Sequence, residues 1–427
     1  MAATQARNSL PADIKRRNIA LILETLVVSG PLSRADLARS TAISGTSISK
    51  LTADLLRAGV LDEDTGAQDG SAGRPARRLR VRQQRRYVVG ADLGASNTRL
   101  LLVDFAGAVV AQETFATDRT ATAPMLLAAI DACLDRMLDV QTLPRDAVRA
   151  MGLGVPCSID PTSGRLWRTE ILPALDSIAI HDLTERSFPF PVVSKRDTNL
   201  AVIGEHAFGV ARAYQDVFLL SVGTGIGGGV LLRGALYEGV QGNAGDIGYL
   251  RLPVIGGEAE TLPILEDIAA GPALIADARA RGHAYGTPPD IFDAARRGDA
   301  GARALVDEAA RYLARALAAA VSLYDPALLV LTGGLGQPDS PLLGPMDRWL
   351  DRLCARRPPL VAGTLSQMAV ARGGVAVALD VVHERTVRAG LDAEPAARHL
   401  ALTIGGALGD LERRAHDGER PRPHERW

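Results

Sequence analysis

Residues 221–229 read Ser-Val-Gly-Thr-Gly-Ile-Gly-Gly-Gly, a glycine-rich turn between two apolar runs at 217–220 and 230–232. The two runs predict a pair of strands joined by this turn. Glycine has no Cβ, so successive backbone N–H groups in such a turn can come close to a phosphate. The phosphate-loop residues that we expect on this turn are Thr224, Gly225, Gly227 and Gly228.

A similar unit lies upstream. Residues 87–92 predict a strand, 93–98 read Leu-Gly-Ala-Ser-Asn-Thr, and 99–103 predict the returning strand. We expect Gly94 and Ser96 to belong to this second phosphate loop. Because the layout occurs twice, and predicted helices alternate with strands elsewhere, the sequence predicts an α/β protein with two similar lobes facing a shared cleft.

The composition indicates a globular protein with more than one domain. The chain has 427 residues, of which 47% are hydrophobic, and this length exceeds that of one ordinary core. Since no apolar run reaches the ~18 residues of a membrane span and no charged-then-apolar leader opens the chain, we expect a soluble cytoplasmic protein with no membrane partner. The three cysteines are widely spaced, which excludes a disulfide scaffold and gives no local metal cluster.

Charge is distributed unevenly along the chain. Residues 1–86 hold 15 Lys and Arg against 8 Asp and Glu, while the remainder holds 33 against 41. A basic head on an acidic body is typical of an N-terminal nucleic-acid-binding module. The alternative is a first domain that is basic by chance.

The basic head carries the pattern of a helix-turn-helix. Residues 12–29 have a helical apolar stripe, Ser33 with Asp36 forms a capping-box pattern for a second helix, and Ser44 can cap a third. Small hydroxyls and one cation in the first turn of the third helix can reach base edges and phosphates. The alternative is a small structural three-helix bundle. The expected DNA-contacting residues in this turn are Ser44, Thr46, Ser47, Ser49 and Lys50.

A turn-rich basic stretch follows at 69–80. It predicts a β-hairpin wing whose cations follow the DNA backbone or enter the minor groove. The alternative is a basic linker between domains. The expected DNA-contacting residues of the wing are Gly73, Arg74 and Arg77.

Together these motifs resemble the ROK family of sugar kinases and sugar-responsive repressors, over residues 10–385. The Gly-Arg-Pro at 73–75 and the Asp-Leu-Gly at 92–94 resemble the xylose- and N-acetylglucosamine-type repressor branch. The resemblance implies an N-terminal winged helix-turn-helix followed by the two-lobed, actin-like or ribonuclease-H-like ATPase fold of sugar kinases.

The resemblance also divides the chain. It implies a DNA-binding domain at 1–86, a two-lobed kinase-like sensor domain at 87–390 and a C-terminal extension at 391–427, whose charged end we expect to be disordered.

Positions of this sequence match the family's sugar side, with departures. Gly154-Val155-Pro156 resembles the family's sugar-side loop, and Asp197 falls on the catalytic base of the kinases. Arg196 stands where the kinases have Asn, Asp246 shortens a sugar-binding Glu, and Tyr249 replaces a His that binds sugar and zinc. The ligand-binding residues that the resemblance implies are Pro156, Arg196, Asp197, Asp246, Tyr249 and Glu266.

The resemblance also bears on cofactors. The family's zinc motif has three cysteines, whereas residues 255–264 contain none. We therefore expect no zinc, no other metal and no required cofactor. ATP with magnesium stays open as a ligand, although Ala95 adds a methyl group where the kinases have no side chain near the phosphate.

Arg196 leaves three alternatives open. It can form an ion pair with the adjacent Asp197 and lower its basicity, because a nearby positive charge favours the carboxylate. It can recruit an acidic ligand, since a guanidinium fork matches a carboxylate or phosphate. It can also lie over the domain surface without a role in the site.

We interpret the sequence as that of a DNA-binding transcriptional regulator, a repressor, whose degenerate sugar-kinase body senses a small carbohydrate-like ligand. Its expected partners are a palindromic operator in double-stranded DNA, a sugar or sugar derivative, and a second copy of the chain in a homodimer or homotetramer. The alternative is a bifunctional regulator that still phosphorylates a sugar with ATP, with Asp197 as catalytic base. A third reading is a DNA-binding protein whose body only dimerises.

Overall fold

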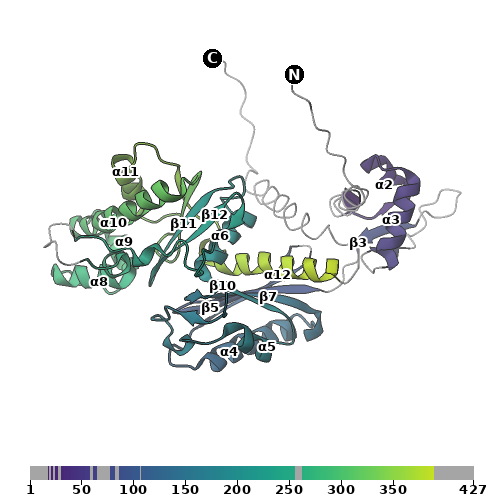
Figure 1. Cartoon of the computed structure of the whole chain (residues 1–427), viewed down its shortest axis with the longest axis horizontal. Coiled ribbons are helices and arrows are strands. Elements are labelled where there is room, and N and C mark those ends of the chain that lie inside the picture. Colours follow the sequence, from purple (N-terminus) through teal and green to yellow (C-terminus); the bar gives the residue numbers. More distant parts are fainter. Residues whose placement is uncertain are drawn as a thin grey trace, which may run out of the picture.

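The computed structural model describes residues 18, 21–22, 25–26, 30–57, 61–64, 77–81, 86–105, 107–254 and 262–388. Two five-stranded sheets form the centres of two lobes (Figure 1). The first lobe contains β4 (Tyr87–Leu93), β5 (Asn97–Asp104), β6 (Val109–Ala116), β7 (Val148–Val155) and β10 (Val192–Arg196). The second contains β11 (Val217–Val222), β12 (Ile226–Leu232), β13 (Ala235–Leu236), β14 (Leu328–Thr332) and β15 (Leu360–Ala362).

Both sheets have the same topology. The first sheet has the order β10-β7-β4-β5-β6 and the second β15-β14-β11-β12-β13. In each, the central strand pairs antiparallel with the next strand of its hairpin and parallel with a later strand on its other side. The two similar lobes predicted from the repeated strand–turn–strand units are therefore confirmed.

Helices cover the faces of both sheets. In the first lobe, α4 (Ala123–Val140) and α5 (Ile180–Ser187) lie on one face, and α12 (Ala369–Arg388) lies on the other (Figure 1). The second lobe carries α7 (Leu265–Ala269), α8 (Gly271–Ala280), α9 (Pro288–Arg296), α10 (Ala300–Tyr324) and α11 (Leu343–Leu353). α6 (Asp197–Phe208) packs between β12 and α12 and so lies where the two lobes meet.

Glycines let α12 approach its neighbours at backbone distance. A Cβ on Gly90 of β4 would lie 1.9 Å from the carbonyl oxygen of Ala371, and one on Gly373 would lie 1.8 Å from that of Leu200 on α6. Any side chain at these positions would force the elements apart. α12 is thus held between the first sheet and α6 by direct backbone contact.

A buried carboxylate joins the ends of the second lobe. Glu205 on α6 has no exposed surface, and its carboxylate accepts hydrogen bonds from the backbone N–H groups of Val210, Thr364 and Leu365 at 3.0, 3.2 and 2.9 Å. Val210 lies where the chain enters the second sheet, and Thr364 and Leu365 lie where it leaves. The two crossings between the lobes are therefore fastened to each other.

A smaller module precedes the lobes. It contains α2 (Arg34–Thr41), α3 (Gly45–Arg57) and an antiparallel sheet of β1 (Leu32–Ser33), β3 (Arg78–Val81) and β2 (Leu61–Asp64) in that order. The predicted capping box is confirmed, because Ser33 and Asp36 exchange backbone and side-chain hydrogen bonds. Ser44 also accepts a hydrogen bond from the backbone N–H of Ser47, as expected of a cap. Buried apolar residues of both helices and two strands form its core.

Some predicted features lie outside the described residues. They are most of the first helix, the wing residues Gly73 and Arg74, residues 255–261 of the zinc-motif segment, and the extension at 391–427. Among the helices in the described ranges, none combines the length and apolarity that crossing a membrane requires.

Candidate functional site

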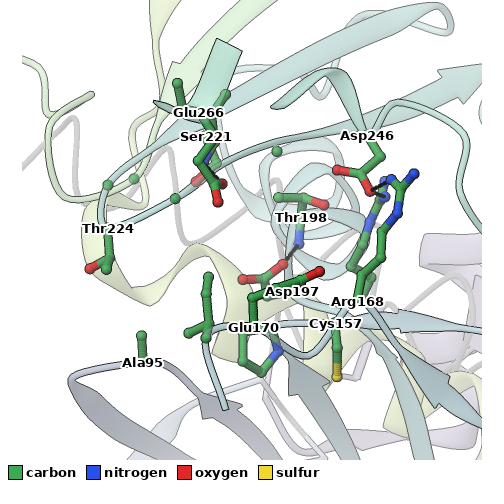
Figure 2. A pocket seen from close by; sticks show the side chains of 18 of the residues that line it. Ala95, Cys157, Arg168, Glu170, Asp197, Thr198, Ser221, Thr224, Asp246 and Glu266 are labelled. Atoms are coloured by element: carbon green, nitrogen blue, oxygen red, sulfur yellow. Dashed lines mark hydrogen bonds and ion pairs between the residues drawn. The ribbon is translucent and has the colours of Figure 1, made fainter. Parts of the chain in front are cut away.

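A cavity of about 200 Å³ lies between the two lobes (Figure 2). The first lobe contributes the β4–β5 turn, residues 156–158 and the junction of β10 with α6, and the second contributes the glycine turn and residues near 246 and 266. All six predicted ligand-binding residues line this cavity, as do Thr224, Gly225 and Gly227 of the predicted phosphate loop. Gly94, Ser96 and Gly228 belong to the same turns but are not part of the lining.

The cavity has two ends of different character. Figure 2 shows Ala95 and Thr224 on one side and Arg168 and Asp246 on the other, with Asp197 between them. We call the first side the glycine half, lined by Ala95, Gly223, Thr224, Gly225, Gly333 and Gly334. We call the second side the arginine half, lined by Arg168, Glu170, Arg196, Asp246 and Tyr249.

The glycine half is built from backbone. The N–H of Gly223 donates to the carbonyl of Gly225 at 2.9 Å, which closes the turn, and the N–H of Ile226 donates to Glu266 Oε2 at 2.7 Å. A Cβ on Gly225 would lie 2.6 Å from that same Glu266 oxygen, so a side chain there would displace the Glu266 carboxylate. Burial raises the pKa of Glu266 above its ordinary value. Glu266 thus fixes the turn through the backbone.

Two buried carboxylates lie near each other, one in the lining of the cavity and one outside it. Asp197 begins α6 and accepts a hydrogen bond from the N–H of Thr198 at 2.6 Å; burial raises its pKa to about 6. Asp92 at the end of β4 is 6% exposed, and burial together with the charge of Asp197 raises its pKa to about 7. Arg99 Nη1 lies 3.3 Å from Asp92 Oδ2, and its positive charge offsets part of this rise in the pKa of Asp92. At neutral pH Asp197 is largely ionised and can accept a proton.

Arg196 connects the lobes at the base of the arginine half. Its side chain is 6% exposed, and Nη2 donates to the carbonyls of Gly228 and Ala244, both at 2.6 Å. Nη1 lies 3.7 Å from Asp246 Oδ2. The alternative that Arg196 lies over the domain surface is therefore wrong. Its short hydrogen bonds go to carbonyls of the second lobe rather than to the neighbouring Asp197.

Arg168 was not predicted and is the second cation of the cavity. It follows β9 (Leu166–Trp167) of the first lobe, and its Nη1 donates to Asp246 Oδ2 at 2.5 Å and to Asn243 Oδ1 at 3.2 Å. The guanidinium carbon lies 3.8 Å from the centre of the Tyr249 ring and 4.8 Å from that of Trp167. Asp246 is thus shared between two guanidinium groups.

Tyr249 makes a further contact between the lobes. Its hydroxyl donates to Glu170 Oε2 at 2.9 Å, and burial followed by the Glu170 hydrogen bond raises its pKa. No motif includes Arg168, Glu170 or Asn243, so sequence reasoning missed all three. Their partners lie some 75 to 79 positions away along the chain. Only the packing of the two lobes brings them together.

The predicted DNA-contacting residues have varied surroundings. Ser44, Thr46, Ser49 and Lys50 are exposed at the start of α3, whereas Ser47 is half-buried. The Arg77 side chain is 58% exposed and lies 2.9 Å from Glu63, which also pairs with Arg34 at 2.6 Å. These three charged groups lie side by side between α2 and the sheet.

Metal ligands do not gather in the described part of the chain. No group of three His, Cys, Asp or Glu side chains placed to hold a metal ion occurs within those residues. Cys133 and Cys157 are buried and Cys354 is partly buried. Cys157 is one of the cavity residues, and burial raises the pKa of its thiol, so it stays protonated.

The sequence and the structure were compared with those of known proteins. The profile of the ROK family matches residues 88–381. The DNA-binding transcriptional dual regulator NagC of Escherichia coli K12 is 25% identical over 341 residues, which cover 77% of this chain and 83% of NagC.

Two solved structures are also similar. A ROK family glucokinase from Streptomyces griseus, in complex with glucose and AMPPNP, has a TM-score of 0.60 and 25% identity and covers 69% of this chain and 99% of its own. A ROK family transcriptional regulator, a homologue of the E. coli MLC protein, has a TM-score of 0.66 and 22% identity and covers 92% of this chain and 99% of its own. The actin-like sugar-kinase fold expected for the two lobes is therefore confirmed.

Proposed function

This chain belongs to the ROK family, and we propose that within it the chain is a DNA-binding transcriptional regulator, a repressor, whose kinase-like body senses a small carbohydrate-like ligand. We place the DNA-binding part in residues 1–86 and the sensor in residues 87–390. Two or four copies would act together on a palindromic operator in the cytoplasm.

The observation that carries the proposal is the state of the arginine half. A sugar kinase must place an acceptor hydroxyl against its base and hold it there while the phosphoryl group arrives. Here Asp246 is paired with Arg168, and Arg196 crosses the base of the same half to bind two carbonyls of the other lobe. Such an arrangement favours recognition of a ligand over phosphoryl transfer to it.

The N-terminal module supports the DNA-binding part of the proposal. The family match begins at residue 88, after the module of α2, α3 and the three-stranded sheet. A helix-turn-helix inserts the N-terminal part of its second helix into the major groove, and the exposed hydroxyls and Lys50 lie in the first two turns of α3. A surplus of basic residues in 1–86 suits the phosphate backbone.

Selection of DNA by the full-length protein tests this proposal. The protein should enrich a palindromic sequence from a random library, and fluorescence anisotropy then measures its affinity. Lys50→Ala should weaken binding about tenfold, because one cation near the DNA is lost. Arg77→Ala should lower the salt slope by about one unit if Arg77 meets a phosphate. Arg279→Ala, an exposed change on α8 of the second lobe, is the control. Failure to enrich any sequence would refute the regulator.

Asp197 keeps the bifunctional alternative open. It begins α6, lines the cavity with the glycine turn and has a pKa of about 6, so it is ionised at pH 8. We expect weak or absent phosphorylation of glucose by the purified protein with ATP and magnesium. Robust turnover that Asp197→Asn abolishes would establish the kinase activity instead.

We also propose that no zinc is needed. Residues 255–264 contain no cysteine, and structural zinc requires four thiolate or imidazole ligands in a tetrahedral set. Elemental analysis of protein purified without chelator should find no stoichiometric zinc. One zinc per chain would mean that ligands converge from distant positions.

A further inference from the structure

Side chains that join the two lobes converge on one short segment. Three side chains of the first lobe bind residues 238–249 of the second lobe. Arg168 donates hydrogen bonds to Asp246 and Asn243. Ser158 donates to Asn243, and Lys195 forms an ion pair with Glu238. We call residues 238–249 the bridge segment.

The glycine half has no such connection. Within the described residues, no side-chain hydrogen bond or ion pair joins the β4–β5 turn to the glycine turn at 223–225. Among the described side chains that line the cavity, the hydrogen bonds and ion pairs between the lobes thus gather in the arginine half.

Arg168 is the centre of this fastening. Its backbone has φ of +56°, a left-handed conformation that is unfavourable for a residue with a side chain and persists where surrounding contacts hold it. Here the Trp167 and Tyr249 rings enclose the guanidinium, and Asp246 receives its N–H. Cation–π contacts and a largely buried ion pair, in which Asp246 is 10% exposed, reinforce each other.

A ligand that uses Asp246 must compete with Arg168. Oδ2 of Asp246 accepts the Arg168 hydrogen bond and is also the oxygen nearest to Arg196. A ligand hydroxyl that donates to this carboxylate would displace the Arg168 guanidinium, and a ligand ring that packs on Tyr249 would take the face that Arg168 covers. Either contact replaces a bond between the lobes with a bond to the ligand.

We propose that Arg168 is a gate residue: it occupies Asp246 in the ligand-free protein, fastens the lobes at the arginine half, and admits only polyhydroxylated ligands that can displace it, so that binding releases the bridge segment. The gate rests on the proposed function. Beyond that function, it assigns to Arg168 a role in ligand specificity. It also couples occupancy of the cavity to movement of the lobes, because a ligand shifts a two-state equilibrium by its differential affinity for the two states.

Hydrogen exchange of the full-length protein without ligand tests the fastening. We expect the bridge segment to exchange about tenfold faster in Arg168→Gln and in Asp246→Asn than in the wild type, since either change breaks the pair. The double variant should exchange more slowly than the two single effects multiplied together would give, because both changes remove the pair of Arg168 with Asp246. Arg165→Gln is the matched control: Arg165 lies in the same hairpin, is exposed, and donates to Ser177 of its own lobe at 2.6 Å.

Other results would overturn the gate. Unchanged exchange in Arg168→Gln, with the variant folded, would show that Arg168 does not fasten the segment. If the effects of Arg168→Gln and Asp246→Asn on the exchange rate were fully additive in free energy, the two changes would act on different contacts. Arg168→Lys, which keeps the charge but loses the fork, should lie between the wild type and Arg168→Gln.

A second readout links the gate to the DNA-binding part. On DNA selected by the wild-type protein, Arg168→Gln should change the affinity at least about fivefold, whereas Arg165→Gln should not. Faster exchange with unchanged DNA affinity would overturn the coupling. If the wild type selects no DNA, the proposed function fails, but the exchange experiment still decides whether Arg168 fastens the lobes.

Discussion

The two halves of the cavity are built in different ways, although the same pair of lobes forms both. In the glycine half the lobes meet across a turn made of backbone, whose shape Glu266 fixes through one N–H. In the arginine half they meet through charged and aromatic side chains. The first half depends on positions where no side chain fits, and the second on which side chains are present. Substitutions can therefore change the arginine half while the glycine half keeps its backbone shape.

The largest effect is expected at Gly228, where the glycine turn packs against the backbone of the segment that carries Asp246. A Cβ on Gly228 would lie 2.5 Å from the carbonyl oxygen of Gly245 and 2.9 Å from Phe218 Cζ. Gly228→Ala should lower the free energy of unfolding by about 3 kcal/mol, measured by urea denaturation, because overpacking forces the backbone apart. Gly334→Ala, whose Cβ meets nothing within 4 Å, is the control and should be nearly neutral. Equal losses for both variants would contradict the role of close approach.

The next effect concerns the arginine half. Arg196→Met keeps the length of the side chain but removes its hydrogen bonds to Gly228 and Ala244. The two carbonyls and Asp246 lose a buried partner, so we expect a loss of about 2 kcal/mol in the free energy of unfolding. Arg279→Met on the exposed face of α8 should change it little. A stable Arg196→Met protein would show that the lobes do not need this bond.

The buried carboxylate of Asp92 predicts that the free energy of unfolding depends on pH. The pKa of Asp92 is raised from 3.8 to about 7, so the folded protein binds this proton more tightly than the unfolded chain. Stability from this group is present at low pH and falls as the pH rises from about 4 to 7. The wild type should therefore lose on the order of 2 kcal/mol relative to Asp92→Asn between pH 5 and pH 8.

Urea denaturation at both pH values measures this difference. Asp139→Asn on α4, an exposed change, should leave the pH dependence as in the wild type. A difference between wild type and Asp92→Asn that does not vary with pH would show that Asp92 titrates normally.

The smallest effect tests whether the glycine half still accepts a nucleotide. Ala95 is the one side chain that the β4–β5 turn adds to the cavity lining. Ala95→Gly should raise the affinity for AMPPNP about threefold by isothermal titration calorimetry, since a methyl group leaves the phosphate path. Ala108→Gly, an exposed change in the next turn, should have no effect. Absence of any binding in both proteins would mean that the glycine half has lost the nucleotide.

The fold was largely predictable because its signals are local. The two predicted strand–turn–strand units are β4 with β5 and β11 with β12. α12 was missed for a physical reason. It is packed on both the first sheet and α6, so its apolar residues form no single stripe, and glycines that permit this packing weaken the helix signal.

The site was predictable only where a motif carried it. The six positions predicted to bind a ligand lie in motifs, and all of them line the cavity. Arg168 and Glu170 lie in a hairpin with no signature, and their roles arise from the approach of a segment far along the chain. The direction of the Arg196 side chain could not be predicted either. It is set by hydrogen bonds to two backbone carbonyls, and because every residue has a carbonyl, the sequence carries no mark of these partners.

Glu205 has a mechanical consequence. The chain leaves the first lobe after β10 and returns to it at α12, so the whole second lobe is one continuous segment that is connected to the first lobe by two crossings. A single carboxylate binds the backbone of both crossings, at Val210 and at Thr364 and Leu365, and so holds the two crossings next to each other. The crossings also join α6 and α12, which pack on each other, and α12 packs on β4, the strand that begins a few residues after the N-terminal module ends. A movement of the second lobe would therefore reach the N-terminal module through α12 and β4.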